Sequence, residues 1–195
     1  SPRTRLVCVQ FGQKLLPAQD QVFAELLARA PQADLTLLTG LQHEDERALA
    51  ERLRPTFTAL GIDFDARVRL RGYISEAEFL TETWQADLVL DSLHWSGGNT
   101  ALETFWGDVP ILTLPGAFMR GRHTAAMLQM MELPELIATD REDFIDKAVA
   151  LVDDCEARLR LRARISERKH CLYRDHRVID AFADLIEREV RMRLA

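Results

Sequence analysis

A glycine turn that leads into a helix is the part of this sequence best suited to chemistry. Gly97 and Gly98 permit a tight turn, and Asn99 or Thr100 can cap the helix that follows. The first N–H groups of a helix have no partner within it and lie at the positive end of the helix dipole, so they favour a bound phosphate. Glu103 follows one turn later, where its carboxylate can accept hydrogen bonds from ribose hydroxyl groups. The segment therefore predicts a phosphate site with a sugar contact beside it.

Each of these residues also has a structural interpretation. An ordinary strand-to-helix turn uses the same glycines, and a glutamate in a first helical turn stabilises the helix through its dipole. His94 and His123 are either acid–base candidates near neutral pH or structural histidines. Arg120 and Arg122 are either phosphate contacts or exposed cations. The sequence shows no metal-binding motif and no nucleophile elbow.

Hydrophobic periodicity predicts strands and helices in alternation. Short apolar runs predict strands at residues 6–11, 35–39, 67–70, 88–90, 109–113 and 135–138. Helical spacing predicts helices at residues 19–29, 45–60, 75–85, 99–106, 121–131, 140–152, 154–169 and from 176 to the end. Ser75 and Glu78 form a capping-box pattern, and Asp140 is a further cap. Pro55 predicts a kink or break in its helix.

The alternation predicts an α/β fold in which helices cover both faces of a parallel sheet. Ligands of such sheets bind beyond the carboxyl ends of the strands. The loops after the first, third, fourth and fifth predicted strands all lie on this edge, and they hold Gln13, Lys14 and the segments 72–75, 92–100 and 115–122. The sequence therefore predicts a binding site at the carboxyl edge of the sheet.

Composition excludes several classes of protein. With 195 residues, 47% of them hydrophobic, the chain can build one substantial core and is not disordered. The net charge of −6 argues against a nucleic-acid-binding surface. Cys8, Cys155 and Cys171 lack metal-type spacing and are typical of reduced thiols. Such thiols lead us to expect a cytoplasmic protein. No apolar run is long enough to span a membrane, and no signal peptide is visible.

Residues 91–116 resemble the C-terminal half of the O-linked N-acetylglucosamine transferase family, the SPINDLY-type glycosyltransferases. That family has an Asn-Gly-His-Thr-Thr turn, an acidic residue three positions on, Leu-Trp-Ala-Gly-Val-Pro and then Thr-Leu-Pro-Gly. The matching text here is the turn at 96–100, Glu103, and the segments 105–110 and 113–116. The match continues at Arg122, at the alanines 125 and 126, in the segment 133–138 and in Phe-Gly-Gln-Lys at 11–14. The likeness covers nearly the whole chain.

This family has the GT-B fold, in which the active site lies between two Rossmann-like domains. The resemblance implies that this chain is the C-terminal, nucleotide-sugar-binding domain, with a doubly wound parallel sheet. We expect a single domain over residues 1–195, of which residues 153–195 form a helical extension. The N-terminal acceptor domain, which in this family can follow helical repeats, is then absent from this chain.

The resemblance also gives roles to a set of site residues. The set is Gln13, Lys14, Phe79, Gly97, Gly98, Asn99, Thr100, Glu103 and Arg122. The turn residues would bind the diphosphate of a UDP-sugar, and Glu103 would bind its ribose. Lys14, helped by Gln13, would neutralise phosphate charge as UDP leaves. Phe79 takes the place of a family histidine and would stack on the base.

The chain departs from the family pattern at this site. Gly98 and Asn99 stand where the family has histidine and threonine. Glu103 replaces an aspartate and reaches further by one methylene. Acidic residues around Glu76 replace a lysine or histidine found near the uracil.

The resemblance thus implies the UDP-sugar-binding half of a glycosyltransferase, active when joined to its N-terminal half. N-acetylglucosamine is a candidate sugar, and a protein or small-molecule hydroxyl is the acceptor. Neither a metal ion nor another cofactor is required, since helix-end N–H groups and Lys14 can replace a cation. No catalytic residue is identified. Two alternatives stay open: a nucleotide-sugar epimerase of the same fold, and a non-catalytic binding or scaffold module.

Overall fold

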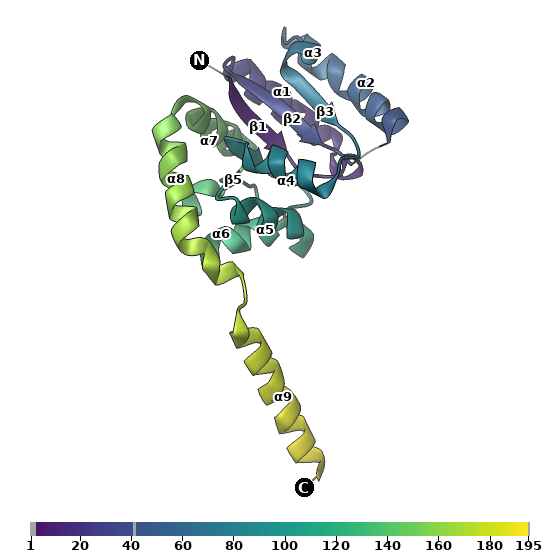
Figure 1. The fold of residues 1–195 in the computed structure, drawn as a ribbon. Helices are drawn as coiled ribbons and strands as arrows, with labels where there is room; N and C mark the ends of the chain where they lie inside the picture. Colours follow the sequence, from purple (N-terminus) through teal and green to yellow (C-terminus); the bar gives the residue numbers. More distant parts are fainter. Residues whose placement is uncertain (1–2, 41, 195) are drawn as a thin grey trace.

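A parallel five-stranded sheet forms the centre of the fold. The computed structural model describes residues 3–40 and 42–194. The strands are β1 (Thr4–Cys8), β2 (Ala33–Leu38), β3 (Val68–Arg71), β4 (Leu88–Leu90) and β5 (Ile111–Leu112), in the order β3-β2-β1-β4-β5 (Figure 1). The chain builds β2 and β3 on one side of β1 and then β4 and β5 on the other, so the sheet is doubly wound. The predicted α/β fold is confirmed.

Helices fill the connections between the strands and continue after β5. The α-helices are α1 (Pro17–Arg29), α2 (His43–Ala59), α3 (Phe64–Arg67), α4 (Glu76–Trp84), α5 (Asn99–Trp106), α6 (His123–Met130), α7 (Arg141–Asp153), α8 (Cys155–Arg168) and α9 (His176–Leu194). The 3-10 helices are η1 (Gly12–Lys14), η2 (Met119–Gly121), η3 (Pro134–Leu136) and η4 (Lys169–Leu172). Each predicted helix has its counterpart here, whereas the single turn α3 has none in the prediction.

The two faces of the sheet carry separate apolar layers. Leu6 and Cys8 of β1 belong to a cluster with apolar residues of α1, α2 and α7. Val7 and Val9 belong to a second cluster, with residues of α5, α6 and α8. Because successive side chains of a strand point to opposite faces, β1 is buried on both sides. This explains why residues 6–9 are a continuous apolar run.

Two helix starts use the predicted capping chemistry. The Ser75 hydroxyl accepts the N–H of Glu78, and the Glu78 carboxylate accepts the N–H of Ser75 at 3.0 Å. Asp140 accepts the N–H of Asp143 at 2.9 Å. These side chains satisfy N–H groups that a helix leaves unpaired, so they define where α4 and α7 begin.

The structure differs from the prediction near two prolines, Pro55 and Pro134. α2 continues from His43 to Ala59 with Pro55 inside it, so the predicted break is absent from this helix. Pro55 lies on an exposed part of the helix, where water can satisfy the carbonyl that a proline cannot bond. The predicted strand at 135–138 is wrong: Pro134 opens η3, and only a single bridge from Ile137 to Thr113 extends the sheet. A proline has no N–H to donate to a strand ladder.

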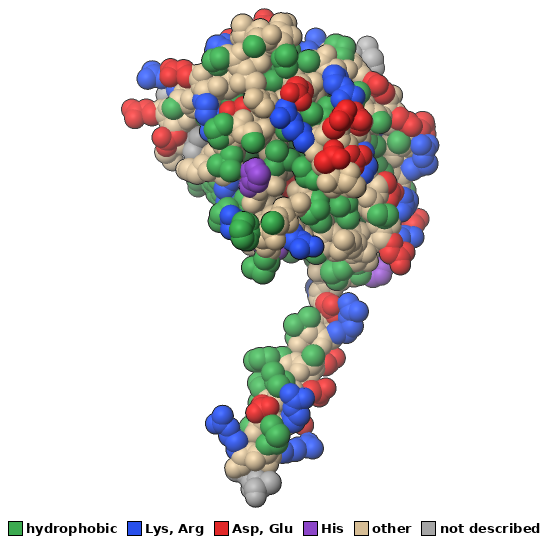
Figure 2. Space-filling model, turned by 180° about the vertical axis from the view of Figure 1, so that it is seen from behind, with side chains coloured by type: hydrophobic (Ala, Val, Ile, Leu, Met, Phe, Trp, Pro, Cys, Tyr) green, Lys and Arg blue, Asp and Glu red, His purple; other side chains and the backbone are tan. Residues whose placement is uncertain are grey.

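The last helix extends away from the rest of the fold. α9 projects from the α/β body (residues 4–172) as a separate column with apolar side chains along it (Figures 1 and 2). Every residue from 176 to 193 is exposed. The large apolar side chains exposed on α9 are Val178, Ile179, Phe182, Leu185, Ile186, Val190 and Met192. In the part of the chain that the structure describes, no helix has the length and apolar character needed to cross a membrane.

Candidate functional site

A hollow of about 260 Å³ opens at the carboxyl edge of the sheet. Its walls come from the segments at the ends of β1, β2 and β3 and from α4 and α5. The lining residues are Val9, Phe11, Leu38, Gly40, Gly72, Tyr73, Ile74, Glu76, Phe79, Thr100 and Glu103. The structure thus brings together Phe79, Thr100 and Glu103 of the predicted set. A mostly apolar wall with two carboxylates suits a ligand that has a flat apolar part and hydroxyl groups.

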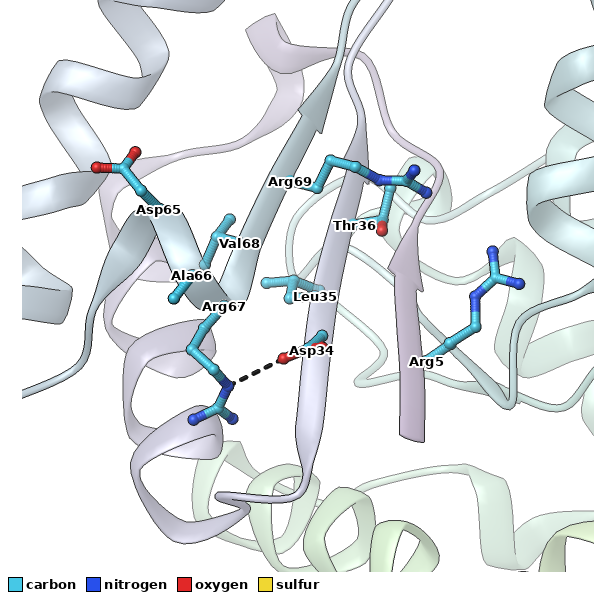
Figure 3. Close-up of a pocket in the computed structure, with 9 residues that line it drawn as sticks. All are labelled: Arg5, Asp34, Leu35, Thr36, Asp65, Ala66, Arg67, Val68 and Arg69. Carbon is cyan, nitrogen blue, oxygen red and sulfur yellow. Dashed lines mark hydrogen bonds and ion pairs between the residues drawn. The ribbon is translucent and has the colours of Figure 1, made fainter. Parts of the chain in front are cut away.

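A larger hollow, of about 470 Å³, lies at the opposite end of the strands. Arg5, Asp34 and Arg67 line it and stand at or beside the first residues of β1, β2 and β3. An ion pair of 3.0 Å joins Arg67 to Asp34 across its wall (Figure 3). Because ligands of doubly wound sheets bind beyond the carboxyl ends of the strands, we place the candidate site at the smaller hollow.

The turn before α5 presents free backbone donors beside that hollow. Gly98 occupies the cap position of α5, and its carbonyl accepts the N–H groups of Ala101 and Leu102. The prediction that Asn99 or Thr100 caps this helix is wrong, because the helix already begins at Asn99. Among the described residues, no acceptor bonds the N–H groups of Gly98, Asn99 and Thr100. These donors lie at the positive end of the α5 dipole, which favours an anion.

Gly97 is the residue of the turn that bonds to buried side chains. Its N–H donates to Asp91 Oδ1 at 2.9 Å, and its carbonyl accepts the Thr124 hydroxyl at 3.3 Å. Asp91 also accepts the N–H of Ser92 at 3.0 Å and the hydroxyl of Thr113 at 2.8 Å. The buried Asp91 carboxylate therefore ties the end of β4 to the turn and to the end of β5. Our sequence reasoning missed Asp91, although a carboxylate directly after a buried strand is a usable signal.

The stability of the chain should depend on pH through Asp91. Burial raises the pKa of Asp91 from 3.8 to about 6, although the hydrogen bonds that the carboxylate accepts limit the rise. The native carboxyl group therefore binds its proton more tightly than the unfolded one, and the native state holds more protons between these two pH values. We expect the Asp91 contribution to the free energy of unfolding to fall as pH rises from about 4 to about 6. Urea denaturation across this range should show that the Asp91→Asn variant lacks this component, and an unchanged slope would contradict it.

The start of α6 lies against the same turn. The N–H of His123 donates to the Ser96 hydroxyl oxygen at 2.8 Å, and the N–H of Ser96 donates to the Arg120 carbonyl at 2.9 Å. Arg122 occupies the cap position of α6 and is exposed, and its guanidinium makes no ion pair with any residue that the structure describes. Arg122 is therefore placed near the turn, with a charge that is free for an anion.

Glu103 lies half-buried in the wall of the hollow. Its pKa is raised, first by burial and then by the negative charge of Glu76. Both carboxylates line the hollow and lie close enough to interact. The Glu103 backbone carbonyl accepts the indole N–H of Trp84 at 2.8 Å, which ties α5 to α4.

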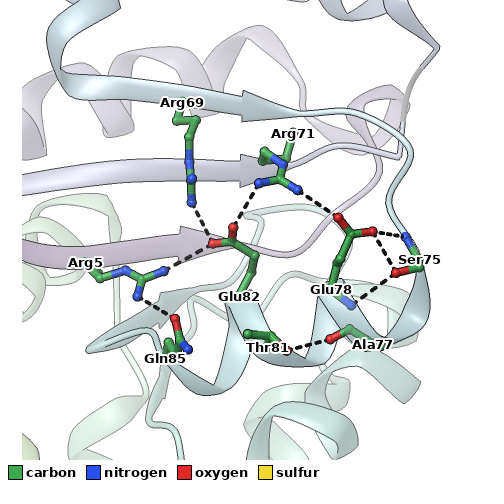
Figure 4. A network of polar contacts seen from close by, with 9 residues as sticks. All are labelled: Arg5, Arg69, Arg71, Ser75, Ala77, Glu78, Thr81, Glu82 and Gln85. Carbon is green, nitrogen blue, oxygen red and sulfur yellow. Dashed lines mark hydrogen bonds and ion pairs between the residues drawn. The ribbon is translucent and has the colours of Figure 1, made fainter.

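A charged network holds α4 across the sheet and so positions Phe79. Glu82 of α4 contacts Arg5 of β1 at 3.2 Å (Figure 4). It also contacts Arg69 at 2.6 Å and Arg71 at 3.1 Å, both on β3. The Glu82 side chain is only 14% exposed, so solvent screens these pairs less than it screens pairs on an open surface. The network fixes α4 over two strands, and Phe79 on α4 then reaches the hollow.

Lys14 lies between two aromatic rings at the edge of the hollow. Its ammonium is 5.6 Å from the ring centre of Phe11 and 5.2 Å from that of Trp95. Phe11 is also part of the hollow's wall, so these cation–π contacts keep the charge near the site. Gln13 precedes Lys14 on η1 and is exposed, and its side chain bonds no described residue.

Gly40 is a wall residue that our sequence reasoning did not find. Its φ is +62°, and a Cβ built there would lie 2.4 Å from the Phe11 ring. A side chain would therefore strain the backbone and displace Phe11. The signal was weak, because a glycine that ends a strand usually marks only a turn.

Comparison with known proteins identifies the family. The model of glycosyl transferase family 41 matches residues 2–175. The chain is 25% identical over 166 residues to a UDP-N-acetylglucosamine--peptide N-acetylglucosaminyltransferase of Caenorhabditis elegans, covering 84% of this chain and 14% of that protein. It is 22% identical over 154 residues to the Arabidopsis thaliana protein named probable UDP-N-acetylglucosamine--peptide N-acetylglucosaminyltransferase SPINDLY, covering 79% of this chain and 17% of that protein. The chain therefore spans a small part of these relatives.

A solved structure agrees with the sequence match. A mutant O-GlcNAc transferase of Thermobaculum terrenum is similar with a TM-score of 0.81 and 26% identity, over 97% of this chain and 36% of that one. The fold is the doubly wound half of a GT-B glycosyltransferase, as the resemblance implied. Since the family model covers most of its length, the chain belongs to glycosyl transferase family 41.

Proposed function

We propose that this chain is the nucleotide-sugar-binding half of a glycosyltransferase that transfers a sugar from a UDP-sugar to a hydroxyl group. One observation carries the proposal: the hollow joins Phe79, Thr100 and Glu103 to the unpaired N–H groups at the start of α5. A nucleoside diphosphate has a matching order of parts, namely a flat base, a ribose and two phosphates. The family membership supports the same donor class.

The base and the ribose would occupy the hollow. The half-buried ring of Phe79 offers a stacking surface for the base. Glu103 would accept hydrogen bonds from ribose hydroxyl groups with its carboxylate. Thr100 lies in the same wall and also in the first turn of α5, so it would stand between the ribose and the phosphates.

The diphosphate would lie against the turn. When the bond between the sugar and the terminal phosphate breaks, its electron pair stays on a phosphate oxygen and negative charge grows there. The N–H groups of Gly98, Asn99 and Thr100 would donate to that charge, and the Lys14 ammonium would attract it. These groups are already in place before the reaction, so they favour the departure of the nucleotide.

The remaining parts of the reaction belong to protein outside this chain. The names of the relatives suggest N-acetylglucosamine as the sugar and a peptide hydroxyl as the acceptor. Those relatives are several times longer than this chain, which agrees with a second half that binds the acceptor and supplies the catalytic base. The free thiols of Cys8, Cys155 and Cys171 agree with a cytoplasmic location.

Calorimetric titration of the 195-residue chain with UDP tests the proposal. We expect UDP to bind, and we expect Thr100→Ala and Glu103→Ala each to weaken binding by about 1–2 kcal/mol, since each removes a polar contact. Thr58→Ala, at an exposed position of α2, and Glu156→Ala, in the first turn of α8, are matched controls that should bind as the unchanged chain does.

Two results would count against this site. The absence of heat at millimolar UDP would remove the donor-binding function altogether. Binding that neither Thr100→Ala nor Glu103→Ala weakens would show that UDP occupies another part of the molecule.

A further inference from the structure

His123 is fixed beside the glycine turn by bonds from its own segment. It is the first residue of α6, and its N–H donates to the Ser96 hydroxyl oxygen at 2.8 Å. The hydroxyl of the next residue, Thr124, donates to the Gly97 carbonyl at 3.3 Å. The backbone that carries the imidazole is therefore bonded to the residues on the amino side of Gly98.

The imidazole borders the open space over Gly98. A Cβ built at Gly98 would meet a single atom within 4 Å outside its chain neighbours, the Nδ1 of His123 at 3.9 Å. Gly98 has no side chain, so the space that a Cβ would occupy is open except toward the imidazole. The imidazole therefore lies next to Gly98, the first residue of the turn with an unpaired N–H group.

The His123 side chain has no partner that explains its position. It is half-buried, and neither ring nitrogen forms a hydrogen bond or ion pair with any residue in the ranges 3–40 and 42–194. A neutral imidazole carries one N–H donor, and a protonated one carries two, so the ring can donate to an oxygen in either state. An unpaired donor beside three unpaired backbone N–H groups extends the set available to an anion.

We propose that the His123 imidazole donates a hydrogen bond to a phosphate oxygen of the bound nucleoside diphosphate. This inference rests on the function proposed above and adds a residue from α6 to a phosphate site otherwise formed by α5 and Lys14. The diphosphate would then be bound by the turn before α5 and by the imidazole on α6. The base and the ribose would lie in the hollow and would not contact His123. Its effect should therefore depend on the phosphates of the ligand.

Calorimetry with UDP and with uridine, on the whole chain, separates this role from a structural one. We expect His123→Ala to weaken UDP binding about ten-fold and uridine binding less than two-fold, because a charge-assisted hydrogen bond is lost only with the phosphates. His123→Gln keeps an N–H donor and should recover part of the UDP affinity. His170→Ala, which removes an exposed histidine on η4, is the matched control and should leave both ligands unaffected.

The outcomes decide between the two proposals. If the unchanged chain binds UDP and His123→Ala binds it equally well, His123 has no role and the donor site stands. A His123→Ala variant that loses UDP and uridine affinity to the same extent would show that the ring supports only the fold, which also overturns the inference. If the unchanged chain does not bind UDP, the proposed function fails, and this inference fails with it.

Discussion

Replacement of Asp91 by alanine is expected to lower the free energy of unfolding by about 3–5 kcal/mol. The carboxylate is buried and accepts the N–H groups of Ser92 and Gly97 and the hydroxyl of Thr113. Alanine would leave these donors buried without an acceptor, at about 1–3 kcal/mol each, and relief from burying a carboxylate would offset part of that cost. Urea denaturation monitored by circular dichroism measures the change in midpoint.

Asp91→Asn is the matched control for that variant. Its amide oxygen can still accept the N–H groups of Ser92 and Gly97, and the Thr113 hydroxyl can rotate to accept from its NH₂ group. We expect a loss of less than half that of alanine. Because Asp91 holds Gly97, the alanine variant should also lose UDP binding. A midpoint for Asp91→Ala close to that of the unchanged chain would contradict the role of Asp91 as an anchor.

Replacement of Arg52 by methionine is the second large expected effect, a loss of about 2–4 kcal/mol. The Arg52 guanidinium bonds both carboxylate oxygens of Asp20, at 3.0 and 2.9 Å, and the Leu15 carbonyl at 2.8 Å. The Asp20 side chain is only 5% exposed, so methionine would leave an uncompensated buried charge. The expected loss is smaller than for a fully buried pair, because Arg52 itself is 36% exposed.

A double variant separates the charge from the packing. In Asp20→Asn with Arg52→Met, neither charge remains, so part of the lost stability should return. Arg52→Lys should lie between the two, since an ammonium cannot form the two-point contact of a guanidinium. Equal stability of Arg52→Met and the unchanged chain would show that the pair contributes nothing. The bond to Leu15 also links this pair to Lys14, the preceding residue, so Arg52→Met should weaken UDP binding as well.

The sequence predicted strands and helices correctly where a local pattern alone determines them. In β1 the apolar pattern predicted the strand but not the residue at which it ends. Its apolar run predicted a strand, but Val9 and Phe11, which continue the run, lie beyond the strand end and line the hollow. An apolar residue in the wall of a binding site looks the same in sequence as one in a strand. The residue at which β1 ends is set by its pairing with β2, and this pairing cannot be read from the sequence.

The sequence predicted where the candidate site lies better than it predicted the hydrogen bonds within the site. The glycine turn is a local signal, and the structure indeed places it beside Glu103 and Phe79 at the carboxyl edge. However, the N–H of Gly97 faces Asp91 instead of the open space, and this direction follows from backbone geometry that residue types do not specify. The neighbour of the turn, His123, is bonded to Ser96 across 27 residues of sequence, so only the folded chain brings them together. The assignment of the nine predicted residues to UDP stays a prediction until binding is measured.

The exposure of α9 has a consequence for every stability measurement on this chain. Most of the stability of a helix in a protein comes from packing its apolar face against another surface. All residues of α9 from 176 to 193 are exposed, so its helix–coil equilibrium is thermodynamically separate from the unfolding of the α/β body. Changes at Asp91 or Arg52 should therefore shift the cooperative transition of the sheet and leave the melting of α9 where it is. We therefore expect two transitions of unequal kind, a cooperative one for the α/β body and a gradual one for α9.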